Sequence, residues 1–444
     1  MKTPIADFVK EYAEQKVTRF HMPGHKGKTF LGCEAFDITE VKGADALYEA
    51  EGIIAESEEN ASELFGTART VFSTEGSSQC IRAMMYLAVN TARKEKKPYV
   101  LAARNVHKAF LYAAALVDFD VKWLWPEEMH SLCSCKVTPE MVEKELSSQE
   151  ELPAAVYLTS PDYLGGCADI QGIAKVCHKY GTILAVDNAH GAYLHFLERA
   201  VHPIDLGADI CCDSAHKTLP VLTGGAYLQI SKNAPENFVK YAKQAMVLFG
   251  STSPSYLTLS SLDLCNRYMA ETYRANLNAM VKQVQQAKEK IRKRGWCVED
   301  TELLKITIKV PDSVTGYQIA ERLRAGKIEC EYADDKYVVC MISPENDLSD
   351  LERLQMVLGD NIYGETNDIS MSPLHSEQVI SIREAVFSQH EVLPLERAEG
   401  RICGAPVVSC PPAIPIVVSG ERISKEAIKM FQYYGITEVE VIKN

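Results

Sequence analysis

Short apolar runs alternate with amphipathic helical stretches from about residue 61 to residue 293. The apolar runs lack the polar alternation of a half-exposed strand, which is typical of strands buried on both faces of a parallel sheet. Helical patterns separate several of these runs, for example near residues 107–117. The alternation predicts an α/β domain with a mostly parallel central sheet. Strands are expected at residues 68–74, 99–103, 155–160, 182–187 and 209–213.

The pattern changes further along and divides the chain. A long helical region over residues 254–293 ends in basic residues before Gly295, as helix C-termini often do. The residues after it alternate strand and helix, and a polar stretch at 364–378 is typical of a linker. We predict an N-terminal segment at 1–60, a large domain at 61–293, a small α+β domain at 294–363 and a C-terminal domain at 364–444.

Composition and charge narrow the class of protein. The chain has 444 residues, of which 46% are hydrophobic, and a net charge of −13. This acidic balance argues against nucleic acid as a partner, because phosphate binding needs a basic face. The N-terminus lacks the apolar core of a signal peptide, and no apolar run approaches the roughly 18 residues of a membrane span. We expect a cytoplasmic protein without a membrane partner, whose 14 cysteines are mostly small, reduced core residues.

A lysine follows one of the predicted buried strands. Lys217 stands in the stretch CCDSAHKTLPVLTGGAYL, residues 211–228, after a short apolar run and before a pair of glycines. Most lysines lie on solvated surfaces, and a lysine that is buried loses its charge readily and becomes a nucleophilic amine. Lys217 is therefore a candidate for covalent chemistry.

Other polar groups follow other strand ends. Asp187 ends the run TILAVD, and Gly76, Ser77 and Ser78 lie between a strand and a helix. Ligands of open α/β sheets bind at the carboxyl ends of the strands. A glycine and two hydroxyls before a helix can form an anion site, and such serines are also ordinary helix caps. Asp187 taken alone could bind a metal, act as a base, contact a ring nitrogen or cap the next loop.

A single ligand would explain these groups together. A lysine, an acid and an anion site on one sheet match an aldehyde, a basic ring nitrogen and a phosphate. His107 follows the strand at 99–103 and could stack on the ring of such a ligand, or be a helix N-terminal residue without a role. We therefore predict pyridoxal 5′-phosphate (PLP) as the cofactor and no metal site.

At these positions the sequence resembles the Orn/Lys/Arg decarboxylases, which are fold-type-I PLP enzymes of basic amino acids. HMPGHK and SAHKTLP are the specific motifs, and the resemblance covers nearly the whole chain, in the short bacterial form. The segments that carry it follow the family's order. They are RFHMPGHKG (19–27), DITEVKGADALYEAEGII (37–54), RNVHK (104–108), TSPDYLGGCADI (159–170), VDNAHGAY (186–193), DSAHKTLPVLTGGA (213–226), STSPSY (251–256) and CPPAIPIVVSGERI (410–423).

The resemblance implies a fold and a set of residue roles. The fold would be a PLP transferase-like α/β domain of fold type I, followed by small α+β domains. Lys217 would carry the cofactor as a Schiff base, Asp187 would pair with the pyridine nitrogen, and His107 would stack on the ring. Ala189 would pack against the opposite ring face, and His190 would support Asp187. The phosphate or its surroundings would be held by Gly76, Ser77, Ser78, Ser214 and His216.

The resemblance also implies a reaction and an assembly. The substrate carboxylate would leave as CO2, and Lys217 or His216 would return a proton to the substrate carbon. The substrate would be a cationic amino acid, namely arginine, lysine or ornithine, and the short form favours arginine. A homodimer with active sites at the subunit interface is implied, to which His25 and residues 251–253 could contribute.

Four residues depart from the family's usual pattern. Glu75 stands where asparagine is usual beside the phosphate turn, and an anion there would repel the phosphate unless it points away or is paired. Asp162 replaces a threonine and is a candidate to receive the distal cation of the substrate. Asn188 and Tyr193 replace an acid and a histidine. These departures affect the expected substrate and reaction more than the expected cofactor.

Three alternatives stay open from the sequence. The first is another fold-type-I PLP enzyme, such as an aminotransferase, for which Arg104 is a candidate to bind the substrate carboxylate, or a lyase. The second is a paralogue that binds PLP without catalysis. The third is a metal-dependent hydrolase that uses Asp187 and His190, which lacks further ligands at suitable spacing.

Overall fold

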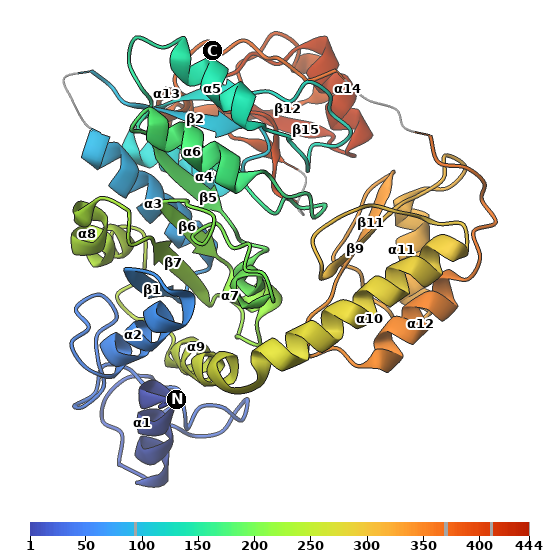
Figure 1. Cartoon of the computed structure of the whole chain (residues 1–444). Coiled ribbons are helices and arrows are strands. Elements are labelled where there is room, and N and C mark those ends of the chain that lie inside the picture. Colours follow the sequence, from blue (N-terminus) through green and yellow to red (C-terminus); the bar gives the residue numbers. More distant parts are fainter. Residues whose placement is uncertain (93–95, 368–371, 409–411, 444) are drawn as a thin grey trace. The chain divides into compact units, whose positions relative to one another are not determined.

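The computed structural model describes residues 1–92, 96–367, 372–408 and 412–443 (Figure 1). Contacts between residues divide the chain into two compact units. The first unit comprises Met1–Arg93, Ala154–Val156 and Ile170–Asn276, and the second comprises Lys94–Pro153, Tyr157–Asp169 and Leu277–Asn444. Two predicted features lie partly outside the described residues, namely the linker, at 368–371, and the C-terminal motif, at 410–411.

A seven-stranded sheet has the strand order β1-β7-β6-β5-β4-β2-β3. Strands β2 and β3 pair in parallel, as do β5 and β6, whereas β7 runs antiparallel to β1 and β6. The mostly parallel sheet predicted from the apolar runs is thus confirmed, and β3 and β7 are strands that the sequence patterns did not indicate. The strands are β1 (Arg69–Ser73), β2 (Tyr99–Ala103), β3 (Asp120–Leu124), β4 (Ala155–Thr159), β5 (Ile183–Asp187), β6 (Ile210–Asp213) and β7 (Ala226–Ile230).

Helices connect these strands and flank the sheet. In the first unit, α3 packs on β6 and β7, and α8 packs on α3. The predicted helical region at 254–293 consists of α9, a π-helical turn at Met269–Tyr273 and α10 in succession. The helices are α1 (Pro4–Glu14), α2 (Ile53–Phe65), α3 (Ser77–Ala92), α4 (Lys108–Val117), α5 (Pro139–Ser147), α6 (Ile170–Lys179), the 3₁₀ helix η1 (Ala192–Phe196), α7 (Ala215–Thr218), α8 (Glu236–Val247), α9 (Tyr256–Tyr268) and α10 (Arg274–Lys293).

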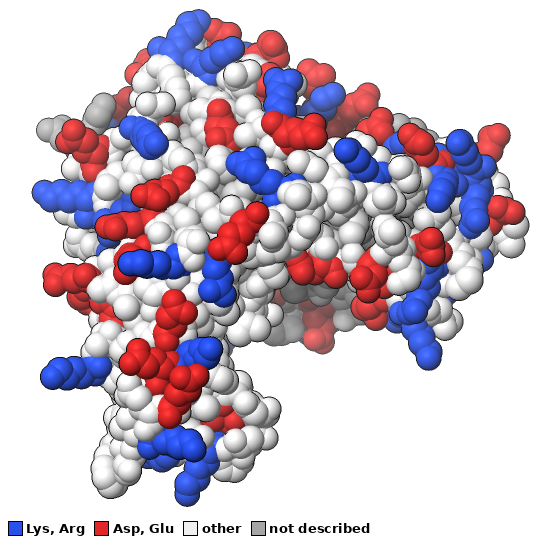
Figure 2. Space-filling model, turned by 60° about the horizontal axis from the view of Figure 1, so that its bottom comes forward, with Lys and Arg blue, Asp and Glu red and all other residues white. Residues whose placement is uncertain are grey.

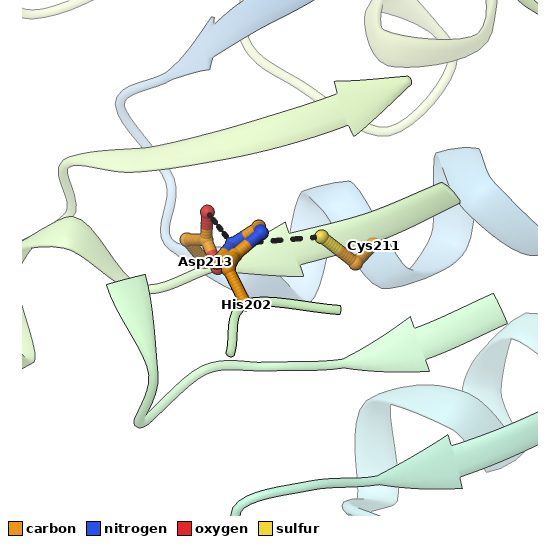
Figure 3. Close-up of side chains that lie close together, drawn as sticks. All are labelled: His202, Cys211 and Asp213. Atoms are coloured by element: carbon orange, nitrogen blue, oxygen red, sulfur yellow. Dashed lines mark hydrogen bonds and ion pairs between the residues drawn. The ribbon is translucent and has the colours of Figure 1, made fainter. Parts of the chain in front are cut away.

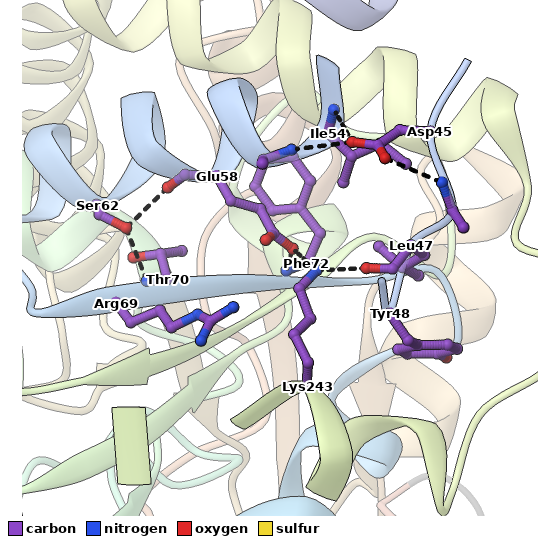
Figure 4. A network of polar contacts seen from close by, with 12 residues as sticks. Asp45, Leu47, Tyr48, Ile54, Glu58, Ser62, Arg69, Thr70, Phe72 and Lys243 are labelled. Carbon is purple, nitrogen blue, oxygen red and sulfur yellow. Dashed lines mark hydrogen bonds and ion pairs between the residues drawn. The ribbon is translucent and has the colours of Figure 1, made fainter. Parts of the chain in front are cut away.

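The edge strand β1 is covered by side chains from α2 (Figure 4). Glu58 accepts the backbone N–H of Phe72 at 2.9 Å, and the hydroxyl of Ser62 accepts the N–H of Thr70 at 2.8 Å. The buried Glu58 is held in turn by an ion pair of 2.5 Å with Lys243 of α8. The outward N–H groups of Phe72 and Thr70 are therefore bonded within the molecule, although none of the strands that the structure describes pairs with this side of β1.

A preordered loop follows α1 and presents large apolar side chains to solvent. The carboxylate of Glu34 accepts the backbone N–H groups of Phe30, Leu31 and residue 32, and the N–H of Leu31 is the largest of the causes that lower the pKa of Glu34 to about 2. Despite this internal order, Phe30 is 80% exposed, Leu31 is 89% exposed and Phe20 is 94% exposed. Exposed aromatic and aliphatic side chains on a preordered loop are typical of an interaction surface.

The second unit contains a small α+β arrangement and a C-terminal part. A four-stranded antiparallel sheet has the order β10-β11-β9-β8, and α11 contacts both α12 and β11. Strands β12 and β15 pair with each other, as do β13 and β14, beside α14. The elements are β8 (Cys297–Val298), β9 (Lys305–Lys309), α11 (Gly316–Ala325), β10 (Tyr332–Ala333), β11 (Tyr337–Met341), α12 (Leu348–Leu358), α13 (Ile382–Phe387), β12 (His390–Pro394), the 3₁₀ helix η3 (Leu395–Arg397), β13 (Val407–Val408), β14 (Pro415–Val417), α14 (Lys425–Tyr433) and β15 (Glu438–Ile442).

An arginine ties the C-terminal part to the segment after β2. The guanidinium of Arg104 donates to the carbonyls of Pro415 and Ile416, each at 3.0 Å, and lies 3.5 Å from the carboxylate of Glu421. It also lies over the rings of Trp123 and Trp125, at 5.1 and 5.4 Å from their centroids. Arg104 is thus engaged inside the second unit, in contacts that hold two distant sequence motifs together.

The surface carries both signs of charge. Lysine and arginine side chains are interspersed with aspartate and glutamate over the face drawn in Figure 2. None of the described helices has the combination of length and apolarity that crossing a membrane requires.

Candidate active site

A tight turn joins β1 to α3 and presents a helix N-terminus. Gly76 has a left-handed φ of +72°, and its N–H donates to the carbonyl of Gly224 at 2.7 Å. Gly224 has a φ of +96°, and a Cβ there would lie 2.6 Å from the carbonyl oxygen of Thr74, so only glycine fits. Ser77 begins α3, and the hydroxyl of Ser214 donates to its hydroxyl at 2.8 Å. The N–H groups and hydroxyls of this turn can bind an anion such as phosphate.

Lys217 lies just beyond the end of β6, in the short helix α7. Its backbone N–H donates to the carbonyl of Ser214 at 3.0 Å, which fixes the direction of the helix. Its Nζ lies 3.1 Å from Nε2 of His190, and the lysine side chain is half-buried. Because an amine and an imidazole at this distance share a hydrogen bond, His190 can exchange a proton with Lys217.

Asp187 is the last residue of β5 and is 2% exposed. Its Oδ1 accepts the backbone N–H of Ala189 at 3.2 Å and the thiol of Cys212 at 3.5 Å. Burial raises the pKa of Cys212 well above its ordinary value, so the thiol keeps its proton and donates. Two donors therefore fix the carboxylate of Asp187 at the end of the strand.

His216 precedes Lys217 and turns its ring towards the glycine pair. Both its backbone N–H and its Nδ1 lie close to the carbonyl oxygen of Gly225, at 3.1 and 3.0 Å. Because a carbonyl oxygen only accepts, Nδ1 carries a proton, and in the neutral ring Nε2 is the acceptor. This contact orients the imidazole beside Lys217.

His107 belongs to the second unit and caps helix α4. Its Nδ1 accepts the backbone N–H of Ala109 at 3.1 Å, and its side chain is half-buried. The neighbouring Lys108 donates its N–H to the carbonyl of Ala413 at 3.0 Å. The start of α4 is thus held by the same C-terminal segment that Arg104 binds.

Two of the departures from the family's pattern have partners within their own units. Glu75 accepts the backbone N–H of Ser251, so this anion is paired with the segment at 251–253. Asp162 accepts the N–H of Gly166 at 2.8 Å and a hydrogen bond from Ser134, and burial raises its pKa. A substrate cation would have to compete with these contacts of Asp162.

The other two departures are fully buried. Tyr193 lies in η1 and has no exposed surface. Asn188, between Asp187 and Ala189, donates from its side-chain amide to the carboxylate of Asp213 at 2.5 Å. The sequence patterns did not indicate a role for Asp213.

The sequence interpretation also did not single out Cys212. Cys212 is the register partner of Asp187 across the β5–β6 pair, which brings its thiol to the carboxylate. In the sequence, Cys212 is only an apolar residue near the carboxyl end of a strand. Its contact with Asp187 depends on the register of β5 and β6. The structure brings Lys217, His190 and Asp187 together with the turn at Ser77 in the first unit, and Ser78 lies in the first turn of α3.

The donor set of the first unit fits PLP. The turn at Ser77 and Ser214 offers donors to a phosphate, Lys217 offers an amine to an aldehyde, and Asp187 offers a fixed carboxylate to a ring nitrogen. These groups follow β1, β6 and β5, at the ends of strands where open α/β sheets bind ligands.

Comparison with solved structures defines the class of protein. The chain superposes on the Francisella novicida lysine decarboxylase LdcF with a TM-score of 0.81 over 99% of this chain and 81% of that one, at 16% identity. It superposes on the E. coli constitutive lysine decarboxylase with a TM-score of 0.79, over 100% and 82% of the two chains, also at 16% identity. The Sphingomonas wittichii serine palmitoyltransferase matches at a TM-score of 0.57, with 15% identity over 79% of this chain and 82% of that one. The fold is that of the fold-type-I PLP enzymes, as the sequence predicted.

Comparison of sequences gives the family. The family model of the Orn/Lys/Arg decarboxylase major domain matches residues 3–342, and that of the C-terminal domain matches residues 358–441. The chain therefore belongs to the Orn/Lys/Arg decarboxylase family, and it is a PLP-dependent decarboxylase of a basic amino acid. The arginine decarboxylase of Bacillus subtilis (strain 168) is 28% identical over 463 residues, which cover 96% of this chain and 92% of that protein. The arginine decarboxylase of Halalkalibacterium halodurans is 28% identical over 96% of this chain and 91% of that protein.

Proposed function

We propose that the chain decarboxylates arginine at the site around Lys217 and that it acts on lysine and ornithine more weakly. The observation that carries the choice of arginine is the coverage of the relatives. Relatives named arginine decarboxylases match over at least 96% of this chain at 27 to 28% identity. The lysine decarboxylase LdcA of Pseudomonas aeruginosa matches over 60% of this chain at 22% identity.

The contacts of the first unit support the residue roles that the family resemblance implies. The hydroxyls of Ser77, Ser78 and Ser214 and the turn at Gly76 would hold the phosphate, with His216 beside them. Lys217 would carry the cofactor through its amine. When bound there, PLP supplies an electron sink for the electron pair that the departing carboxylate leaves.

The remaining roles concern the ring of the cofactor and the second unit. Asp187, fixed by the N–H of Ala189 and the thiol of Cys212, would face the ring nitrogen and keep it protonated. Ala189 would pack against one face of the ring, and His107 would stack on the other. The imidazole of His107 is half-buried and is held by the N–H of Ala109 in its own helix. A ring with a fixed orientation suits a stacking role.

The proton that the reaction needs can come from groups beside Lys217. Loss of CO2 from an amino acid consumes one proton, which must reach the former α-carbon. The amine of Lys217 and the imidazole of His190 are 3.1 Å apart, so they can hold this proton between them, and His216 is the second candidate donor. His190 would thereby exchange a proton with Lys217 and also support Asp187.

The substrate assignment predicts the product of a direct assay. We expect the purified chain with PLP to convert L-arginine to agmatine and CO2, with a kcat/KM at least ~10-fold above those for L-lysine and L-ornithine, because a site built for a guanidinium leaves its polar groups unpaired with a shorter amine. The amine is identified by mass, and CO2 is measured from carboxyl-labelled substrate.

Each other outcome of this assay points to a different alternative. Formation of a 2-oxo acid without CO2 would identify an aminotransferase, and PLP binding without turnover of any cationic amino acid would identify an inactive paralogue. Faster release of cadaverine or putrescine would move the assignment to lysine or ornithine and leave the reaction class unchanged.

We further propose a homodimer, in which the loop at residues 17–36 contacts a second copy of this chain. Phe20, Phe30 and Leu31 are at least 80% exposed in the single chain, while Glu34 holds the loop in a fixed form. Large apolar side chains that are both ordered and exposed favour a protein partner. In a symmetric dimer the same surface of each subunit meets its counterpart, so a second copy of this chain can cover these side chains. His25 and the segment at 251–253 remain candidates to contribute to the partner's site.

Replacing the exposed apolar side chains should separate the subunits. The triple variant Phe20→Ser, Phe30→Ser and Leu31→Ser is expected to raise the dimer dissociation constant by at least ~10²-fold, because it removes most of the apolar area of the loop. Sedimentation velocity measures the change, and Met356→Ser, which alters a side chain 71% exposed on α12, is the matched control. A wild-type chain that sediments as a monomer at every concentration would refute the dimer.

Two further parts of the proposal concern location and domain organisation. A cytoplasmic location suits the buried thiols of Cys211 and Cys212, whose pKa values burial raises well above the ordinary range. The division of the chain into domains at residues 60, 293 and 363 stays a proposal.

A further inference from the structure

A cluster of buried polar side chains lies behind the candidate active site in the first unit. Its centre is the carboxylate of Asp213, the last residue of β6, which has no exposed surface. Nε2 of His202 lies 3.1 and 3.2 Å from its two oxygens, and Nε2 of Gln229 donates to it at 3.0 Å. Asn188 adds a fourth contact, at 2.5 Å. Figure 3 shows Asp213 and His202 facing each other, and Sγ of Cys211 lies 3.9 Å from the same Nε2 of His202.

A metal site is one interpretation of this cluster. Ligand atoms of His202, Cys211 and Asp213 lie within 4.8 Å of one another. The hydrogen bonds argue against it. The N–H of Ile204 donates to Nδ1 of His202 at 3.3 Å, so Nε2 carries the proton and points it at Asp213. A metal would displace that proton and the donors from Asn188 and Gln229, and burial favours the protonated thiol of Cys211. The cluster is therefore a hydrogen-bonded network.

This network reaches the candidate active site through Asn188. The backbone N–H of Asn188 donates to the carbonyl of Cys212 at 3.0 Å, and its side-chain amide donates to the next residue of the same strand, Asp213. The N–H of Gly191 donates back to the carbonyl of Asn188 at 2.8 Å, and a Cβ at Gly191 would lie 2.0 Å from Oδ1 of Asn188. Both anchors fix the short loop on which His190 is carried.

The Asn188–Asp213 hydrogen bond links the segments that carry His190 and Lys217. His190 follows Asn188 by two residues, and Lys217 follows Asp213 by four. A shift of the Asn188–Asp213 contact would therefore change the distance between Nε2 of His190 and Nζ of Lys217, which is 3.1 Å. It would also move Asp187, which is bonded in sequence to Asn188.

We propose that Asn188 and Asp213 form a positioning pair, which sets the separation of His190 from Lys217 and the direction of the Asp187 carboxylate. The pair touches neither substrate nor cofactor and acts through these three residues. The proposal rests on the proposed function of Lys217 as the amine that carries PLP. Asp213 is the buried charge of the pair, and His202 and Gln229 hold it in place.

A charge swap tests the pair. Asn188→Asp places two carboxylates against each other, and it is expected to lower kcat by about 10²-fold with little change in KM, because displacement by about 1 Å costs that much. The double variant Asn188→Asp with Asp213→Asn restores one amide–carboxylate hydrogen bond with its ends exchanged. It should recover at least ~10-fold of the loss. Asn188→Ala, which adds no charge, covers the case in which Asn188→Asp fails to fold.

A spectroscopic readout separates positioning from simple loss of stability. The visible absorbance of PLP bound to the chain depends on the protonation of its lysine linkage, and we expect its pH midpoint to shift in Asn188→Asp and Asn188→Ala and to return towards wild type in the double variant. The affinity for PLP, measured by fluorescence, should follow the same order. Cys211→Ser, which changes the contact with His202 and keeps the hydrogen bond between Asn188 and Asp213, should leave the midpoint in place.

The outcomes are distinct. A double variant no better than Asn188→Asp, or a pH midpoint that is the same in Asn188→Ala and wild type, would overturn the positioning pair. Stoichiometric metal in the purified protein, lost in Cys211→Ser, would replace the network by a metal site. Borohydride reduction and peptide mass spectrometry of the wild type are expected to place the cofactor on Lys217. If they place it elsewhere, the proposed function of Lys217 fails first, and this outcome is distinct from a failure of the double variant in a chain that does carry PLP on Lys217.

Discussion

Replacing Lys217 by alanine is expected to lower kcat by at least ~10⁴-fold and to abolish covalent attachment of PLP. The amine of Lys217 is the nucleophile that would hold the cofactor, and it is one of the two groups that would hold the reaction proton. The substitution also removes Nζ, which lies 3.1 Å from Nε2 of His190. Borohydride reduction followed by mass spectrometry of the peptide measures attachment, and release of labelled CO2 measures kcat.

Two other lysine variants make this test specific. Lys217→Arg keeps a positive charge but offers a guanidinium, which is not a nucleophile, so it should be as inactive as the alanine variant. Lys232→Ala changes an exposed lysine of the same unit and should behave as wild type. Reducible attachment that survives in Lys217→Ala would show that another amine anchors the cofactor.

Replacing Asp187 by asparagine should lower kcat by about 10³-fold while the fold is retained. The amide has the same shape and can still accept from the N–H of Ala189, so the loop keeps its form. It lacks the negative charge that would keep the ring nitrogen of PLP protonated, and removing one such preorganised electrostatic partner typically costs 10²- to 10³-fold or more. Steady-state kinetics with arginine measure the loss, and the thermal midpoint of the PLP-loaded protein reports on the fold.

A second aspartate of the same unit controls for the loss of a carboxylate. Asp205 pairs with His195 at 2.8 Å near the surface, so Asp205→Asn should change kcat by less than about twofold. An Asp187→Asn enzyme that keeps more than a tenth of the wild-type kcat would remove Asp187 from its proposed role.

The central features of this site could be predicted because each is a local pattern. Lys217, Asp187 and the turn at Gly76 all follow short apolar runs. A run of this kind predicts a buried strand, whichever strands are its neighbours in the sheet. The rule that ligands bind at the carboxyl ends of such strands then places the three groups together without knowledge of strand order. The family resemblance added the roles of neighbouring residues.

The supporting contacts could not be predicted because they depend on register and on distant pairings. The thiol of Cys212 meets Asp187 only because the two are register partners in a parallel pair. Arg104 reaches Glu421 across 317 positions of the sequence. Glu75, an anion beside the phosphate turn, is explained by its bond to the backbone of Ser251, which no local pattern indicates. Each of these contacts is set by tertiary structure.

The contact between α2 and β1 has a consequence for how the chain behaves at high concentration. An open sheet edge can recruit an extended segment of another molecule, and such growth starts from unbonded N–H groups. Here Glu58 and Ser62 accept hydrogen bonds from the outward N–H groups of Phe72 and Thr70, so a segment of another molecule cannot pair with these two groups of β1. The side chains of Glu58 and Ser62 thereby disfavour the addition of further strands at this sheet edge, which is one route to fibre growth.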